Sequence, residues 1–102
     1  MKLNPCIKYD RALFLEVGEH IPLKFENNVF YNINCSTRES VIVSWARPGQ
    51  YGNGHVNCRS QGYVQARMKD YGFTYDKKVS FFLREKSTFS WFKNNIMVFK
   101  RF

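Results

Sequence analysis

The sequence VIVSWARPGQYGNGHVNC occupies residues 41–58 and joins a candidate strand to a polar loop. Residues 41–43 are all β-branched, and such residues fit a pleated sheet that is covered on both faces. A proline and three glycines then exclude regular structure from the loop 46–58. Open α/β sheets bind ligands at the carboxyl ends of their strands, so this loop is a candidate ligand site. An ordinary surface loop explains the same composition equally well.

A second candidate strand lies upstream, at residues 10–15. It ends in four consecutive apolar residues, and a run this short and bounded is typical of a buried strand. The turn EVGEHIP follows at once at residues 16–22, with two carboxylates and an imidazole within five residues. We interpret it as a second functional turn at the end of a strand. The alternative is that Glu19 and His20 only cap the next helix.

A helix is predicted between these two strands. Pro22 suits a first helical turn, and Phe25, Val29 and Ile33 recur at intervals of four. A crossover of this length allows the two strands to run parallel, and the connection between them is then expected to be right-handed. The turns 16–22 and 46–58 therefore emerge at the same edge of the sheet.

The second half of the chain continues the alternation of strands and helices. Ser60 is a candidate N-cap for a helix that ends at Gly72, and a short strand follows at 73–75. Asp76 can cap a further helix, and residues 94–100 form a final strand. We predict one α/β domain over residues 1–102, with two parallel strands, then a C-terminal antiparallel pair, and two to three helices.

The net charge of +8 is unevenly distributed. Residues 59–102 carry ten Lys and Arg against three Asp and Glu, whereas residues 1–58 carry six against five. A basic second half favours an anionic partner such as nucleic acid or a phosphorylated substrate. A solvated surface that only keeps the protein soluble is the alternative interpretation.

The three cysteines, Cys6, Cys35 and Cys58, are odd in number and widely spaced, which predicts free thiols in a reducing compartment. The sequence contains no Cys-x-x-Cys or His-x-x-x-His pair, so we expect no metal site. It contains no apolar run of the roughly 20 residues that cross a bilayer, and its start lacks the apolar stretch of a signal peptide. We therefore expect a cytoplasmic protein without membrane contact.

Three blocks in this order carry a family resemblance: LEVGEHIP at residues 15–22, SWAxPGQxGxGHVN at 44–57 and WFKNxIMVF at 91–99. Together they resemble one subgroup of the class I S-adenosylmethionine-dependent methyltransferases, from the fourth strand of that fold to the seventh. The resemblance implies a partial Rossmann-like methyltransferase sheet. It also implies that the first strand with its Gly-x-Gly cofactor loop, and the acidic residue that holds the ribose, have no counterpart in this sequence.

The resemblance places a reaction site at the two turns. His20 and His55 would then be the catalytic residues that accept a proton, because imidazole gains and loses a proton near neutral pH. The residues expected beside substrate or S-adenosylmethionine are Glu16, Glu19, Trp45, Gln50 and Asn57.

The absent half of the fold also has implications for partners and activity. The strand 10–15 would lie at an open sheet edge, which a second copy of the chain or a complementing chain would cover. We expect a methyltransferase-like protein that is inactive or binds its cofactor weakly on its own. The alternative is a small basic module that binds nucleic acid or protein through residues 59–102 without catalysis.

Overall fold

The computed structural model describes residues 7–50 and 52–102. In chain order the elements are β1 (Tyr9–Leu15), two 3-10 helices (Gly18–His20 and Leu23–Phe25), α1 (Glu26–Ser36), β2 (Thr37–Ser44), α2 (Gln61–Asp70), β3 (Phe73–Tyr75), α3 (Lys77–Lys86), α4 (Ser90–Asn95) and β4 (Ile96–Arg101).

The described strands form one sheet in the order β1-β2-β4-β3. β1 and β2 run parallel, and their last paired residues are Leu15 and Ser44. β4 is antiparallel to both of its neighbours, β2 and β3. The α/β class is confirmed, and so are the parallel pair and the C-terminal antiparallel pair.

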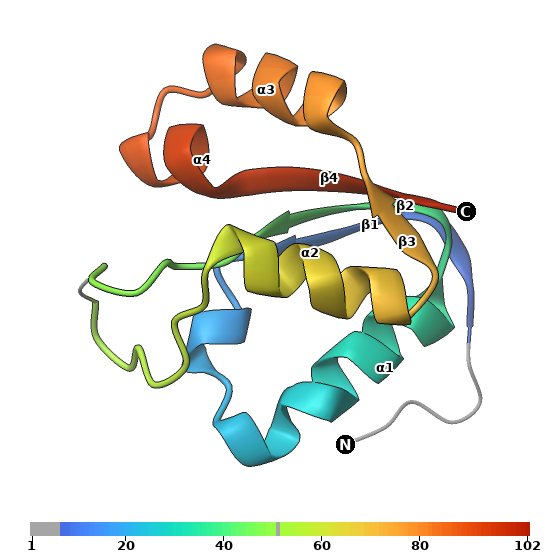
Figure 1. Cartoon of the computed structure of the whole chain (residues 1–102), viewed down its shortest axis with the longest axis horizontal. Helices are drawn as coiled ribbons and strands as arrows, with labels where there is room; N and C mark the ends of the chain where they lie inside the picture. Colours follow the sequence, from blue (N-terminus) through green and yellow to red (C-terminus); the bar gives the residue numbers. More distant parts are fainter. Residues whose placement is uncertain (1–6, 51) are drawn as a thin grey trace.

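Helices cover both faces of this sheet, α1 and α2 on one side and α3 and α4 on the other (Figure 1). The main core lies between the sheet and the pair α1 and α2. It comprises Phe30, Ile33, Val41, Val43, Trp45, Val64, Met68, Phe73, Met97 and Phe99. The alternation along β2 sends Val41 and Val43 into this core, and both are at most 1% exposed.

The capping residues of α2 and α3 behave as the sequence predicts. Ser60 Oγ accepts a hydrogen bond from the backbone N–H of Tyr63 at 3.1 Å. Asp76 Oδ1 accepts one from the N–H of Val79, also at 3.1 Å. Each cap satisfies a helix N–H group that has no partner within its own helix, and so fixes where the helix begins.

β1 differs from the buried strand that its apolar run predicts. Tyr9 is 61% exposed and Leu13 is 71% exposed. The reason is position, because β2 is the one strand that pairs with β1 among the described residues. An edge strand with apolar residues on its exposed side has the same apolar sequence pattern as a buried strand.

The final strand begins two residues later than predicted. Asn94 and Asn95 belong to α4, a helix that the sequence pattern did not indicate, and β4 begins at Ile96. Asn95 is fully buried, where its Oδ1 accepts from Arg47 at 3.1 Å and its Nδ2 donates to Gln50 at 2.8 Å. These long-range polar contacts hold the helical turn, and a local apolar pattern carries no information about them.

Candidate functional site

Two polar turns meet at the carboxyl ends of the parallel strands β1 and β2. The N–H of Glu16 donates to the carbonyl of Ser44 at 3.1 Å and to its hydroxyl at 2.9 Å. The hydroxyl donates in turn to the Glu16 carboxylate at 2.9 Å. Glu16 also has a φ of 55°, a strained conformation for a residue other than glycine. Such strain persists where surrounding contacts impose it, and it is concentrated at functional sites.

Backbone hydrogen bonds fasten the second turn to the first. The carbonyl of Glu19 accepts from the N–H groups of Val56 at 2.8 Å and Asn57 at 3.0 Å. His20 Nδ1 lies 3.0 Å from the carbonyl oxygen of Gly54. The expectation that the turns 16–22 and 46–58 emerge at one edge is therefore confirmed.

Two glycines allow this close approach. A Cβ atom on Gly18 would lie 2.4 Å from Cδ2 of the Trp45 ring, so the turn 16–20 can rest on that ring only without a side chain. Gly54 has a φ of +76°, and a Cβ there would lie 3.2 Å from His20 Nδ1. The glycines of the two sequence blocks thus place the second turn against the first.

Glu19, His20 and His55 form a cluster of potential ligands at this junction, which we call the Glu–His–His cluster. One ligand atom from each residue lies within 4.8 Å of the other two. The imidazole rings are 4.9 Å apart between centroids and meet edge to face at 75°. Glu19 is fully buried, and neither of its carboxylate oxygens has a hydrogen-bond partner among the described residues. A buried carboxyl group in this state is costly.

Two further titratable groups border the cluster. Burial raises the pKa of Glu16, and the neighbouring charge of Glu19 raises it further, against the lowering effect of the Ser44 hydrogen bond. Burial and the charges of Glu19 and Glu16 also raise the pKa of the Cys58 thiol. Cys58 Sγ lies 3.8 Å from His55 Nδ1, but a thiol with a raised pKa is a poor nucleophile.

The cysteines differ from the sequence expectation in part. Cys58 is a free thiol in the described part of the chain. Cys35 is disulfide-bonded, so the expectation of a free thiol is wrong at that position. Cys6 lies outside the described residues.

Trp45, Gln50 and Asn57 have their polar groups engaged within the fold. Trp45 is 1% exposed, and its Nε1–H donates to the Asn57 carbonyl at 2.7 Å. Gln50 Oε1 accepts from the N–H of Arg47 at 2.6 Å and from Asn95 at 2.8 Å. These three residues, predicted beside substrate or cofactor, hold the loop 46–58 on the core.

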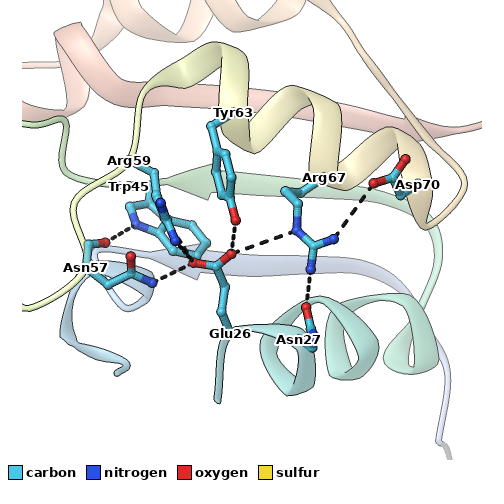
Figure 2. A network of polar contacts seen from close by, with 8 residues as sticks. All are labelled: Glu26, Asn27, Trp45, Asn57, Arg59, Tyr63, Arg67 and Asp70. Atoms are coloured by element: carbon cyan, nitrogen blue, oxygen red, sulfur yellow. Dashed lines mark hydrogen bonds and ion pairs between the residues drawn. The ribbon is translucent and has the colours of Figure 1, made fainter. Parts of the chain in front are cut away.

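Glu26 is the centre of a second polar cluster, which the sequence analysis did not find (Figure 2). It is 3% exposed, accepts from Asn57 at 2.7 Å and from Arg59 at 3.0 Å, and also accepts from the Tyr63 hydroxyl. Arg67 Nε lies 3.8 Å from the same carboxylate. Burial alone would raise the pKa of Glu26, but the hydrogen bonds from Asn57, Tyr63 and Arg59 outweigh it and lower the pKa.

A spacing signal for this Glu26 network was present in the sequence. Arg59, Tyr63 and Arg67 recur every four residues. Tyr63 and Arg67 lie on one face of α2, and Arg59 lies just before this helix begins. Two arginines and a phenol gathered at one side of a packed helix need an acidic partner. Glu26 begins α1, which lies across from α2 in Figure 2.

Several arginines of the basic second half are used inside the fold. Arg59 and Arg67 contact Glu26. Arg84 donates to the Ile96 carbonyl at 2.7 Å, and Arg101 donates to the Tyr71 carbonyl at 3.1 Å. Part of the positive charge that the sequence assigned to an anionic partner therefore stabilises the chain itself.

A solved methyltransferase structure shares the fold of this chain. The chain is similar to magnesium protoporphyrin IX methyltransferase from Synechocystis PCC 6803, which was crystallised with bound SAH. The TM-score is 0.66 at 16% sequence identity, and the similarity covers 94% of this chain but 46% of that one. The chain thus spans about half the length of the protein it matches. No protein-family model and no curated protein sequence matches it.

No helix among the described residues is both long enough and apolar enough to cross a bilayer.

Proposed function

We propose that this chain is part of an S-adenosylmethionine-dependent methyltransferase and contributes one side of its reaction site. The observation that carries the proposal is the coincidence of two features. The fold matches a methyltransferase over 94% of the chain. The Glu–His–His cluster and Glu16 lie together at the carboxyl ends of two parallel strands, where open α/β sheets bind ligands.

The side chains at this edge suit the chemistry of methyl transfer. The cofactor supplies an activated methyl group on a positively charged sulfur, so the protein mainly positions the acceptor and excludes water. The carboxyl group of Glu16, partly buried beside Glu19, would steady that positive charge. His20 is exposed and His55 is half-buried, so either imidazole can accept a proton from an incoming oxygen or nitrogen acceptor.

A further polypeptide segment would complete the sheet along β1. Apolar Leu13 is 71% exposed on this edge strand. A groove of about 450 Å³ beside it is lined by the apolar residues Ile42, Val79, Leu83 and Val98, among others. The methyltransferase that the chain resembles is about twice as long. We propose that this edge and groove are covered by strands and helices equivalent to the other half of that fold, in the same polypeptide or in a partner.

The proposal that the edge of β1 is open in the isolated chain can be tested by hydrogen exchange and sedimentation. We expect the chain alone to exchange the outward amides of residues 11–15 rapidly and to self-associate weakly or not at all. A tight dimer with protected amides along 11–15 would show instead that a second copy occupies the edge. A monomer with the same amides protected would contradict an open edge altogether.

A second candidate function is binding of single-stranded nucleic acid. Phe89 and Trp91, 54% and 42% exposed, stack on each other with ring centroids 4.7 Å apart. The exposed lysines Lys86 and Lys93 lie close to them in sequence. Exposed aromatic rings among lysines are typical of surfaces on which bases stack.

Residue-resolved titration by NMR separates the two functions. We expect S-adenosylhomocysteine to shift amides of residues 16–20 and 52–57, with weak affinity, because half of a cofactor pocket retains only part of the contacts. Glu16→Gln should weaken the binding of S-adenosylmethionine, whose sulfur carries the positive charge, about fivefold or more, whereas the matched surface variant Glu39→Gln should not change it.

Two other results would contradict the methyltransferase proposal or favour the nucleic-acid function. No amide shift at millimolar S-adenosylhomocysteine would overturn the methyltransferase proposal for this chain. Amide shifts at 86–93 on addition of an oligothymidine, lost in Trp91→Ala and weakened by salt, would favour the nucleic-acid function.

A further inference from the structure

We infer that the Glu–His–His cluster binds a divalent transition-metal ion, with Glu19, His20 and His55 as protein ligands. Two imidazoles and one carboxylate form a ligand set that Zn²⁺ and other first-row metals use, with the remaining positions open to water or substrate. Imidazole ligands favour such metals over Mg²⁺ or Ca²⁺, which prefer oxygen ligands. The inference does not rest on methyl transfer.

The separation of the three ligand atoms is close to that of a metal site. They lie within 4.8 Å of one another. Three atoms within that limit lie at most about 2.8 Å from a central point, and Zn–N and Zn–O bonds are about 2.0–2.1 Å long, so inward movements of at most about 0.7 Å would form the site. His20 is exposed and can make this movement by turning its side chain.

The hydrogen bonds of both imidazoles suit metal binding. His20 Nδ1 lies 3.0 Å from the Gly54 carbonyl, and His55 Nδ1 lies 3.2 Å from the Gln50 carbonyl. A carbonyl oxygen accepts only, so these two contacts favour the tautomer with the hydrogen on Nδ1 and a lone pair on Nε2. Metal-binding histidines commonly donate their other N–H to a backbone carbonyl in this way.

The buried carboxyl group of Glu19 is the independent observation that points to a cation. It is fully buried, and neither oxygen has a hydrogen-bond donor among residues 7–50 and 52–102, apart from a hydrogen that it can share with the carboxyl group of Glu16, which raises the pKa of Glu16. Buried charges in proteins are paired or coordinate metals. The backbone of Glu19 is also held in place, since its carbonyl accepts from the N–H groups of Val56 and Asn57. The alternative role for its carboxyl group is to share a proton with neighbouring Glu16.

The spacing rules for metal motifs miss this site because its ligands are not periodic. Glu19 and His20 are adjacent in the turn after β1, and His55 comes from the loop after β2. Only the parallel pairing of the two strands brings them together. With an ion bound, the Nε2 lone pairs would be occupied, and the ion would take the place of a free imidazole in facing an acceptor oxygen.

The test is titration of the untagged, metal-free chain with Zn²⁺ alone, followed by calorimetry, and with Co²⁺, followed by visible absorption. We expect one ion per chain with micromolar or tighter affinity, a Co²⁺ spectrum of low coordination number, and a melting temperature that rises with Zn²⁺ concentration. His20→Ala changes an exposed side chain and should weaken Zn²⁺ binding about 100-fold, and Glu19→Gln should do the same.

Cys58→Ser is the matched control, because the thiol lies 3.8 Å from His55 without belonging to the cluster. It should bind Zn²⁺ as the parent chain does. Absence of stoichiometric binding would overturn the inference, as would equal affinity in the parent chain and His20→Ala. A loss of binding in Cys58→Ser, with His20→Ala unaffected, would assign the ion to the thiol. None of these results depends on S-adenosylmethionine, so they are separate from the outcome for the proposed function.

Discussion

Two buried glutamates seven positions apart, Glu19 and Glu26, have opposite surroundings. Glu26 is 3% exposed and receives hydrogen bonds from Asn57, Arg59 and Tyr63. Glu19 is fully buried, and its carboxylate receives none from the part of the chain that the structure describes. Yet both lie near the same loop, because Asn57 contacts Glu26 by its side chain and Glu19 by its backbone.

The difference separates a structural cluster from a candidate ligand site. A buried acid with a full set of hydrogen-bond donors holds elements together. Here Glu26 joins α1 to α2 and to the loop that precedes α2. A buried acid without donors, next to two imidazoles, costs stability that the chain must recover elsewhere.

Glu26→Ala should have the largest effect. It leaves the guanidinium groups of Arg59 and Arg67 without their buried partner, so the free energy of unfolding should fall by about 3–5 kcal/mol. Urea denaturation followed by circular dichroism measures this. The exposed Glu39→Ala should change the value by less than about 0.5 kcal/mol. A similarly small change for Glu26→Ala would show that the Glu26 network does not stabilise the fold.

Tyr63→Phe should have a smaller effect of the same sign. It removes the hydroxyl that donates to Glu26 but leaves the ring over which Arg59 stacks at 4.2 Å. Loss of one hydrogen bond to a charged group costs about 1.5–3 kcal/mol of unfolding free energy. Tyr75→Phe is the matched control, since its ring packs against Phe99. Equal stability of the two variants would mean that the Tyr63 hydroxyl contributes nothing.

Glu19→Gln should change stability least among the buried carboxyl variants. It removes no hydrogen bond to the carboxylate within the described residues, so the metal-free variant should lose less than about 1 kcal/mol or gain stability. Chemical denaturation of the metal-free chain, with Glu26→Gln measured in parallel, gives the comparison directly. A loss for Glu19→Gln as large as that for Glu26→Gln would mean that Glu19 has a structural partner after all.

The pH dependence of stability should separate Glu16 from Glu26 in sign. The pKa of Glu26 is lowered from 4.5, so its contribution is present above pH 4.5 and is lost as the pH falls through the folded value. The pKa of Glu16 is raised from 4.5, so its contribution is present below pH 4.5 and is lost as the pH rises through the folded value. Unfolding free energies of Glu16→Gln and Glu26→Gln, measured against pH and subtracted from the parent curve, should therefore slope in opposite directions. Difference curves that slope the same way would contradict these assignments.

The local patterns were sufficient for most of the fold. β-branched runs, the caps Ser60 and Asp76, and the crossover length predicted the parallel strands and the helices between them. They failed where partners distant in sequence act. The exposure of β1 depends on which strands lie beside it, and the helical turn at Asn95 depends on contacts with Arg47 and Gln50.

For the candidate site, sequence reasoning selected two turns that the fold brings together, but it could not assign roles within them. It gave Trp45 and Asn57 the same standing as Glu19, because all are polar or aromatic residues in conspicuous blocks. Burial and hydrogen bonding distinguish them. Trp45 and Asn57 have their polar groups satisfied within the core, and the Glu19 carboxylate is unsatisfied as far as the described residues go.

The most direct test of the ligand-site assignment is a long-range proton–nitrogen NMR spectrum of the two imidazole rings, recorded in mildly alkaline buffer before and after adding one equivalent of Zn²⁺. Our account predicts that His20 and His55 both carry the hydrogen on Nδ1, and that the Nε2 signals of both rings move on metal addition while Nδ1 stays protonated. Rings that carry the hydrogen on Nε2, or Nε2 signals that do not respond to Zn²⁺, would contradict it.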